Sequence, residues 1–499
     1  MIYISLEGHD FKYDLFQLTK AFFPYEEIVF LEKQEEYNSQ GYLLKSILYE
    51  RYNKTYAKTS IYSDGSFLID KAQCIDYIDI GKNSIKQSIK IGIKKTVYES
   101  LLSISDRNMP WGILTGIRPV KIVHDLLDRK VNEIKILNIL TKEYKLAPQK
   151  AKLIINISKR QRKYIYPLNK DRFSLYISIP FCPSRCVYCS FPSVPVARYS
   201  SFIQDYRDKL IWEIQKIREL MEGKSINTVY IGGGTPTAIP PKDLEKIIEG
   251  VYLNFGEANI KEFTVEAGRP DTINKEILIM LNRHNIDRIS INPQTMNDKT
   301  LKLIGRNHNK EDIKRAYHLA KEIGFKVINM DLIVGLPSEG KDEIINTLME
   351  IEKLDPENLT VHTLAVKRGS KFKETMDRYT VGNQYTIEDM IEETTNFANK
   401  MDLNPYYLYR QKQMMGNFEN IGYSKEGTEC IYNMAIMEEK ETIIGAGMGA
   451  VSKIFFPEEN RLERVPNFKD MKEYLERTDE LIERKKKGLT FLHDNRLNI

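Results

Sequence analysis

Three of the five cysteines stand together in one short segment of the chain. Cys182, Cys186 and Cys189 follow a C-x3-C-x2-C spacing at the end of a stretch that reads as a β-strand. Three thiolates on one loop can hold three irons of a four-iron, four-sulfur ([4Fe-4S]) cluster, and no fourth cysteine lies near in sequence, so one iron is left open for a ligand that is not protein. The alternative interpretation is a zinc site or three packed thiols, since free cysteine is often buried and inert, although zinc motifs usually contain two paired C-x2-C half-sites.

A glycine-rich segment follows the next predicted strand. Residues 231–237 read Ile-Gly-Gly-Gly-Thr-Pro-Thr. Glycines, which lack a Cβ atom, allow a ligand to approach the backbone closely, and exposed N–H groups there can bind a carboxylate. A triple glycine by itself is more often a tight turn, but its position one strand after the cysteines indicates a ligand site.

Polar side chains stand at the ends of the later predicted strands. Glu266 ends the third strand and Gln294 follows the fourth, while Arg306 and Asp331 come further along the chain. Carboxylate and amide groups at neighbouring strand ends can hydrogen-bond an amino acid or a ribose. An arginine can clamp a carboxylate. Glu266 could instead be a solvated loop acid, and Arg306 and Asp331 could be members of structural ion pairs. No residue is singled out as catalytic.

The elements that must position these residues form a regular pattern between about residues 170 and 365. Short apolar strands alternate there with amphipathic helical stretches. The strands are predicted at residues 175–179, 228–231, 262–266, 287–291, 326–333 and 359–364. Right-handed crossovers make such a sheet parallel, and active sites in barrels lie at the carboxyl ends of the strands. The sequence therefore predicts an α/β fold with a partial (β/α)6 TIM-like barrel.

The flanking regions predict two further domains. We expect an N-terminal α+β extension over residues 1–165, the core over 166–370 and a mostly helical C-terminal domain over 371–499. In the extension, residues 1–6 and 60–70 read as strands, and the Gly and Pro residues of the run 110–119 indicate an ordered turn that opens a helix. We assign no chemistry to the extension.

Composition limits the remaining possibilities. The chain has 499 residues, 42% of them hydrophobic, and a net charge of +5, which does not demand a nucleic-acid partner. The N-terminal residues lack the order of a signal peptide, and no apolar run approaches the length of a membrane span. Cys74 and Cys430 give no disulfide framework. These features favour a cytoplasmic protein.

Taken together, the motifs resemble the oxygen-independent coproporphyrinogen III oxidase family of radical S-adenosylmethionine (SAM) enzymes. The residues that carry the resemblance are Tyr-x-x-Ile-Pro-Phe-Cys, Gly-Gly-Gly-Thr-Pro, the strand-end Glu, Arg-Ile-Ser…Gln, Gly-Arg-x-His and Asp-Leu-Ile-x-Gly-Leu-Pro, in this order over about residues 172–365. The N-terminal extension, with Trp-Gly-Ile-Leu-Thr-Gly-Ile-Arg-Pro, looks like the coproporphyrinogen dehydrogenase-like branch.

The resemblance implies a set of cofactor contacts. Cys182, Cys186 and Cys189 would ligate a [4Fe-4S] cluster whose open iron binds SAM, which is then cleaved to a 5′-deoxyadenosyl radical. The residues implied around the first SAM are Tyr176, Gly233, Glu266, Gln294, Arg306 and Asp331. Family members that bind a second SAM use positions that match Tyr188, Gly234, Thr235, Ile333 and Ala365.

The resemblance also implies a reaction. It is the oxidative decarboxylation of two propionates of coproporphyrinogen III to vinyl groups, giving protoporphyrinogen IX, with an electron donor such as flavodoxin or ferredoxin. Arg269, Lys367 and Arg368 could clamp the substrate carboxylates. This chain departs from the oxidase pattern at Ser178, where the oxidase has His, and at Ser190-Phe191, where it has Gly-Cys.

Two other functions stay open at this point. One is a haem-binding or haem-delivery protein of the same family, in which His308, His318 or His362 could be an axial ligand. The other is a radical SAM enzyme that methylates haem or opens its ring. The tetrapyrrole partner, substrate or haem, is thus implied by the resemblance alone.

Overall fold

The computed structural model describes the chain except for residues 33–36, 38–39, 78–83, 108, 117, 366–383, 412–417 and 495–499. It divides into two units, Met1–Lys159 and Arg160–Ile499. The helix α5, Pro148–Ile165, crosses from one unit into the other.

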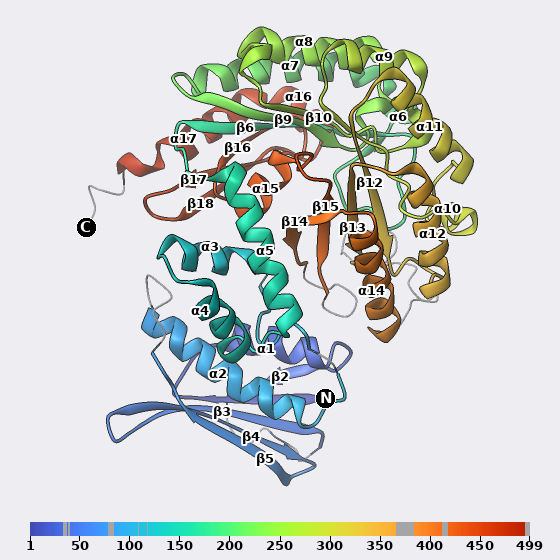
Figure 1. Cartoon of the computed structure of the whole chain (residues 1–499). Helices are drawn as coiled ribbons and strands as arrows, with labels where there is room; N and C mark the ends of the chain where they lie inside the picture. Colours follow the sequence, from blue (N-terminus) through green and yellow to red (C-terminus); the bar gives the residue numbers. More distant parts are fainter. Residues whose placement is uncertain are drawn as a thin grey trace. The chain divides into compact units, whose positions relative to one another are not determined.

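The first unit is built on a five-stranded sheet in the order β2-β1-β3-β4-β5. Its strands are β1 Ile2–Glu7, β2 Ile28–Phe30, β3 Tyr42–Arg51, β4 Lys54–Ser63 and β5 Ser66–Cys74. Its helices are α1 Lys12–Phe22, α2 Ser84–Leu102, α3 Val120–Asp128, α4 Glu133–Asn138 and the first part of α5. Helix α2 packs against β4 and β5 and covers one face of the sheet (Figure 1). The unit is therefore α+β, as the sequence indicates.

The strand predicted over residues 60–70 is wrong, because the structure has a hairpin there. β4 ends at Ser63, and the chain turns through Asp64 and Gly65 into β5, which pairs back onto β4. Both turn residues have positive φ, 48° and 81°. An Asp-Gly pair with this geometry is the preferred two-residue hairpin turn, and it divides the stretch into two antiparallel strands.

The run 110–119 opens a helix, as the sequence predicts. Trp111 is fully buried, and the turn that contains it leads into α3. Gly112 has φ +52° and lies against the backbone of Tyr144 and Lys145, where a Cβ atom would find no room. Trp111 and Gly112 therefore pack within the first unit.

The second unit contains the predicted barrel. The six core strands are β6 Arg172–Ile179, β9 Ser225–Gly233, β10 Glu262–Val265, β11 Arg288–Ser290, β12 Val327–Val334 and β13 Asn358–Thr363. They pair in parallel and in chain order. The crossover helices are α7 Ile203–Leu220, α8 Pro241–Phe255, α9 Lys275–Arg283, α10 Asp298–Leu303, α11 Lys310–Ile323 and α12 Lys341–Leu354. Figure 1 shows these helices outside the curved sheet, so the partial (β/α)6 barrel is confirmed.

The region after residue 371 contains helices, as the sequence predicts, and also strands that the sequence did not indicate. Five strands lie there: β14 Asn404–Tyr409, β15 Asn420–Ser424, β16 Thr442–Ala446, β17 Val451–Phe456 and β18 Arg461–Pro466. They extend the core sheet to the order β14-β15-β13-β12-β11-β10-β9-β6-β16-β17-β18. The four described helices are α14 Gln384–Lys400, α15 Ile431–Glu438, α16 Met471–Glu476 and α17 Thr478–Asp494. Pairing with exposed edges of the core sheet stabilises these short strands, a tertiary effect that local charge patterns do not reveal.

The glycine-dense segment 445–449 supports the strand that leads to the cysteines. β16 pairs in parallel with β6, and a Cβ atom on Gly447 would lie 2.4 Å from the Ser178 carbonyl oxygen. The Gly447 N–H donates to Glu213 Oε2 at 2.8 Å. Glu213 is fully buried and pairs with Lys485, also fully buried, at 2.9 Å. The segment therefore needs glycine in order to approach the end of β6.

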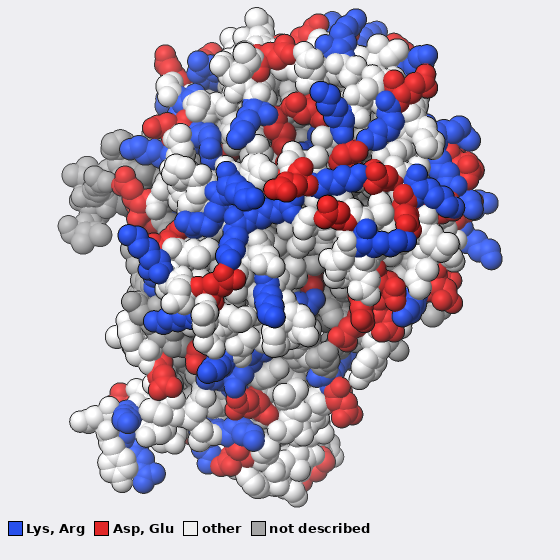
Figure 2. All heavy atoms as spheres, viewed as in Figure 1, with Lys and Arg blue, Asp and Glu red and all other residues white. Residues whose placement is uncertain are grey.

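The charged side chains are interspersed at the surface. Figure 2 shows Lys and Arg among Asp and Glu over the face that is drawn. This distribution agrees with the small net charge of +5. Among the described residues, no helix is long and apolar enough to cross a membrane.

Candidate functional site

The three clustered cysteines lie on the loop that follows the first barrel strand. β6 ends at Ile179, the short strand β7, Phe181–Cys182, follows, and the loop returns to β8, Val194–Pro195, which pairs with β7. Cys182, Cys186 and Cys189 are free thiols. Burial raises the pKa of Cys182, and the charges of Cys189 and Cys186 add to this rise. The structure therefore brings the three predicted ligands together.

The cysteine loop is fixed to the segment after α10. The Val187 N–H donates to the Ile304 carbonyl at 3.1 Å, and the Ser184 hydroxyl donates to the Gly305 carbonyl at 3.2 Å. Within the loop, the Cys189 N–H donates to the Cys186 carbonyl at 3.1 Å. The loop geometry is thus defined by the protein's own hydrogen bonds.

The donor set fits a [4Fe-4S] cluster with one open iron. The loop provides three thiols, and two buried arginines lie near Cys186. Arg269 Nη1 lies 3.9 Å from the Cys186 sulfur, and the Arg306 charge interacts with Cys186. Both arginines are less than a tenth exposed. Cationic groups beside thiolates offset the negative charge that a cluster with three cysteine ligands carries.

The triple glycine faces two parts of the site. A Cβ atom on Gly232 would lie 2.8 Å from the Glu266 carboxylate, and one on Gly234 would lie 2.7 Å from the Phe181 carbonyl oxygen. Gly233 has φ +108°, a conformation that L side chains rarely adopt. Thr235 follows, with its hydroxyl 3.5 Å from the Cys182 sulfur. These glycines let the β9 loop pass beside both the cysteine loop and Glu266.

Replacing Gly234 with alanine is expected to lower the free energy of unfolding by about 1–3 kcal/mol, because the new methyl group meets backbone atoms that have to shift. Chemical denaturation followed by circular dichroism measures the effect. Gly116→Ala is the matched control, since no atom lies within 4 Å of the Cβ position there. Equal stability of the two variants would contradict the close packing at Gly234.

Glu266 lies at the end of β10 and faces the barrel interior. Its Oε1 accepts a hydrogen bond of 2.6 Å from the Tyr230 hydroxyl. Burial raises the pKa of Glu266 to about 7, the Asp331 charge adds to the rise, and the hydrogen bonds from Tyr230 and the Gly233 backbone oppose it. A carboxyl group with this pKa changes its charge near neutral pH and can accept from a ligand's N–H or O–H groups when ionised.

Asp331 and Gln294 are joined through the backbone of β12. The Gln294 N–H donates to the Asp331 carbonyl at 2.9 Å, and Gln294 has φ +67°. Burial would raise the pKa of Asp331, but His362, with further hydrogen bonds from Asn329 and Thr360, lowers it. Asp331 and Glu266 are thus two interacting carboxyl groups in the interior, and Asp331 is the one held ionised.

Arg306 is committed to protein partners. Its Nη1 donates to the carbonyl groups of Gly268 and Asn292, both at 3.2 Å, and its Nη2 donates to the Tyr188 hydroxyl at 3.0 Å. Its buried Nε lacks a partner within the described residues. Tyr188 and Arg306 are therefore brought together, and the Nε N–H of Arg306 remains for a ligand.

The remaining predicted contacts lie around the same interior. Tyr176 stacks on Tyr230 and Tyr432, with ring centroids 6.3 and 6.1 Å apart. Ile333 is buried opposite His362 in the pairing of β12 and β13, and Ala365 comes just after the end of β13.

Several further polar residues lie near the cysteine loop and were not predicted as cofactor contacts. Arg269, considered above as a carboxylate clamp, is buried and paired with Asp271, and Asp271 in turn contacts His308. The side-chain oxygen of Asn292 is buried and lacks a partner among the described residues. The Ala-Gly-Arg-Pro-Asp segment directly after Glu266 was the one sequence signal for this group. Lys367 and Arg368 lie outside the described residues.

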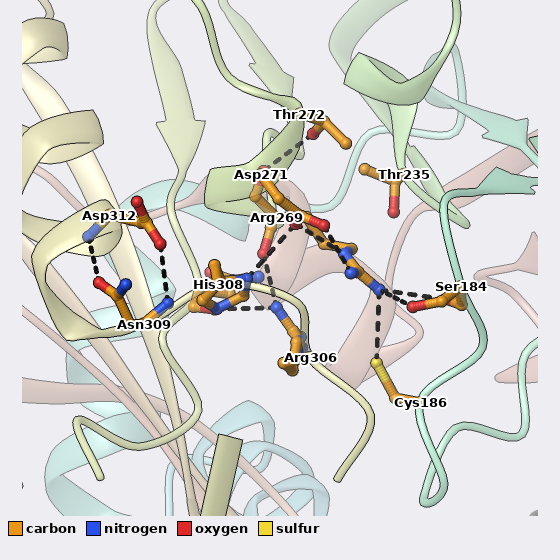
Figure 3. Close-up of polar contacts among 12 residues, drawn as sticks. Ser184, Cys186, Thr235, Arg269, Asp271, Thr272, Arg306, His308, Asn309 and Asp312 are labelled. Carbon is orange, nitrogen blue, oxygen red and sulfur yellow. Dashed lines mark hydrogen bonds and ion pairs between the residues drawn. The ribbon is translucent and has the colours of Figure 1, made fainter. Parts of the chain in front are cut away.

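Asn309 follows His308 and is the N-cap residue of α11 (Figure 3). Its side chain accepts from the N–H groups of Glu311 and Asp312, and Asp312 accepts in return from the Asn309 N–H, which forms a capping box. We expect Asn309→Ala to lower the free energy of unfolding by about 1 kcal/mol, since backbone donors lose their acceptor. Urea denaturation measures this, and exposed Asn307→Ala is the control. No difference between the two variants would contradict the capping role.

Comparison with known proteins places this site in a family. Residues 176–351 match the radical SAM superfamily. The oxygen-independent coproporphyrinogen-III oxidase-like protein HemZ of Bacillus subtilis is 42% identical over 413 residues, 82% of each chain. The haem chaperone HemW of Escherichia coli is 28% identical over 57% of this chain and 71% of its own.

A solved structure supports the fold. The coproporphyrinogen III oxidase HemN of Escherichia coli, described as a radical SAM enzyme, aligns with a TM-score of 0.51 and 22% identity over 65% of this chain and 72% of its own. The match to HemZ covers 413 residues, whereas residues 160–499 number 340, so it also includes part of the first unit. This chain therefore belongs to the radical SAM family of oxygen-independent coproporphyrinogen-III oxidase-like proteins.

Proposed function

We propose that this protein catalyses the oxygen-independent oxidative decarboxylation of coproporphyrinogen III to protoporphyrinogen IX. In this reaction two propionate side chains each become a vinyl group. Each one loses a hydrogen atom from its β-carbon, a molecule of carbon dioxide and one electron, which passes to an external acceptor. The observation that carries the proposal is the 42% identity to an oxidase-like relative over 82% of both chains.

The site supports the cofactors that this reaction needs. Cys182, Cys186 and Cys189 would hold a [4Fe-4S] cluster, which with bound SAM supplies a radical able to take hydrogen from an unactivated carbon. We propose that the first SAM is bound by Tyr176, Gly233, Glu266, Gln294, Arg306 and Asp331. A second SAM, where one binds, would contact Tyr188, Gly234, Thr235, Ile333 and Ala365. The electron would come from a carrier of the flavodoxin or ferredoxin class.

In this scheme the carboxyl groups of the protein orient the ligand through hydrogen bonds that they accept when ionised. Ionised Asp331 can accept hydrogen bonds from ribose hydroxyls, and Glu266, when ionised, can accept from an ammonium group. The stacked rings of Tyr176, Tyr230 and Tyr432 lie beside Glu266, to which the Tyr230 hydroxyl donates. Positioning of the substrate and exclusion of water are the contributions that protein groups make to such a reaction.

An anaerobic assay tests the proposal. The protein is reconstituted with iron and sulfide and supplied with SAM, dithionite and coproporphyrinogen III, and 5′-deoxyadenosine and the porphyrin mass are measured together. We expect a product that has lost two carbon dioxide molecules, with deoxyadenosine formed in step. Formation of deoxyadenosine with no change in the porphyrin would overturn the proposed reaction.

Haem binding is the second candidate function, and relatives named haem chaperones favour it. The three candidate histidines differ in their surroundings. His308 contacts Asp271, His318 lies on the outer helix α11, and His362 lies between Asp331 and Tyr409 with its side chain 28% exposed. His318 is exposed on the outer helix, whereas His362 lies beside Asp331 of the proposed site, so His362 is the candidate ligand.

Haem titration separates this function from the oxidase reaction. Stoichiometric haem binding that weakens in His362→Ala, without SAM cleavage that depends on coproporphyrinogen, would support haem delivery. The third possibility, methylation or ring opening of haem, would appear as a changed haem mass in the same anaerobic assay with haem as the substrate.

A further inference from the structure

Arg269 lies buried between two loops of the site. It is 4% exposed, and its Nε and Nη2 donate to the two carboxylate oxygens of Asp271 at 2.9 and 2.7 Å. This paired geometry fixes the plane of the guanidinium group. Asp271 comes two residues after Arg269 on the loop that follows β10, so the pair is rigid and belongs to one loop.

The third nitrogen of the guanidinium group reaches the cysteine loop. Figure 3 shows Arg269 directed at Ser184 and Cys186. Nη1 donates to the Ser184 carbonyl at 3.1 Å and to the Ser184 hydroxyl at 3.0 Å, and lies 3.9 Å from the Cys186 sulfur. The arginine therefore connects the loop after β10 with the loop that carries the thiols.

A third loop joins at Asp271. His308 Nδ1 lies 3.4 Å from Asp271 Oδ1, and His308 is buried. The three loops that follow β6, β10 and α10 are thus linked through His308, Asp271, Arg269 and Ser184. Since Arg269 alone of these residues touches a thiol, it is the point at which this network meets the proposed cluster.

We propose that Arg269 is a positioning residue for the cluster, which holds the Cys186 loop in place and makes the cluster easier to reduce by placing a positive charge beside the Cys186 sulfur. The inference rests on the proposed ligation by the three cysteines. Hydrogen bonds to cluster sulfurs and nearby net charge set the reduction potential of iron–sulfur clusters. A cation near a ligand sulfur stabilises the reduced, more negative state and so raises that potential.

The charge role and a purely structural role make different predictions for two substitutions. Arg269→Gln removes the cation, so the equilibrium constant for one-electron reduction is expected to fall about tenfold, or about 59 mV for a one-electron couple. Asp271→Asn removes the anion and leaves the arginine charge without its counterion. The potential is then expected to rise, whereas damage to the loop would not reverse sign between the two variants.

The experiment measures cluster content and potential in the full-length protein. Each variant is reconstituted anaerobically, its iron and sulfide are counted, and the midpoint potential is determined by dye-mediated titration with electron paramagnetic resonance detection. Arg269→Lys keeps the charge and is expected to restore most of the potential. Arg315→Gln is the matched control, because Arg315 is exposed on α11, where its charge is screened.

The outcomes are distinguishable. A wild-type protein that takes up no cluster would overturn the proposed function, and this inference with it. A wild-type cluster with an unchanged potential in Arg269→Gln would overturn the role of Arg269 alone. Where Arg269→Gln fails to retain a cluster, Asp271→Asn decides: a raised potential supports the inference, and an unchanged or lowered potential overturns it.

Discussion

Replacing Cys186 with alanine is expected to abolish cluster binding and, with it, every SAM-dependent activity of this chain. The loop offers three thiols, and all three are needed if one iron is to stay open for SAM. With two thiols, one of the three irons that the cysteines would hold loses its protein ligand. The described neighbours of Cys186 do not replace it. Anaerobic reconstitution followed by iron and sulfide analysis and SAM cleavage measures the loss.

Cys74→Ala is the matched control for this substitution. Cys74 is a half-buried free thiol at the end of β5 in the first unit. The Cys74→Ala substitution is expected to leave iron content and SAM cleavage at the wild-type level. Wild-type iron content in Cys186→Ala would show that this cysteine is not a ligand. It would also remove the reason to regard the C-x3-C-x2-C segment as the metal centre.

The barrel and the cysteine loop were predictable because their signals are local. Each core strand is a short apolar run that ends at a polar or glycine-rich loop, and parallel strands with helical crossovers place all these loops at one edge of the sheet. The predicted strands agree with β6 and β9 to β13 within a few residues. The close spacing of Cys182, Cys186 and Cys189 is likewise a local property of the sequence.

The features that were missed depend on contacts distant in sequence. The hydrogen bonds from Arg269 to Ser184 join residues 85 positions apart, and the close approach of Gly232 to Glu266 becomes visible only once β9 and β10 pair. The strands after residue 404 form because the core sheet offers edges to pair with. Residue type and periodicity contain little information about such partners.

Glu266→Gln is expected to weaken SAM binding by roughly tenfold to a hundredfold at pH 8, since a hydrogen bond to a charged group contributes about 1.5–3 kcal/mol. The pKa of about 7 adds a pH dependence. In the wild type, affinity should rise as pH increases through 7 and level off at about pH 8, because only ionised Glu266 attracts an ammonium group. In Glu266→Gln this dependence should disappear. Isothermal titration calorimetry from pH 5.5 to 8.5 measures both effects.

Ionisation of Glu266, which is expected to strengthen SAM binding, should lower the stability of the ligand-free protein. The pKa of Glu266 in the folded state, about 7, is raised above the ordinary value of 4.5, so the folded protein binds this proton more tightly than the unfolded chain does. Its contribution to stability is present below about pH 4.5 and is lost as pH rises to 7. Glu266→Gln should therefore stabilise the protein at pH 8 while it weakens SAM binding.

Glu339 is the matched control that separates these two effects. Burial raises its pKa to about 7 as well, but its Oε1 accepts from the Thr295 hydroxyl, at 2.7 Å, and it is absent from the predicted SAM contacts. Glu339→Gln should therefore raise stability at pH 8 and leave SAM affinity unchanged. Equal losses of affinity in both variants would mean that Glu266 acts through the general stability of the barrel and does not contact the ligand.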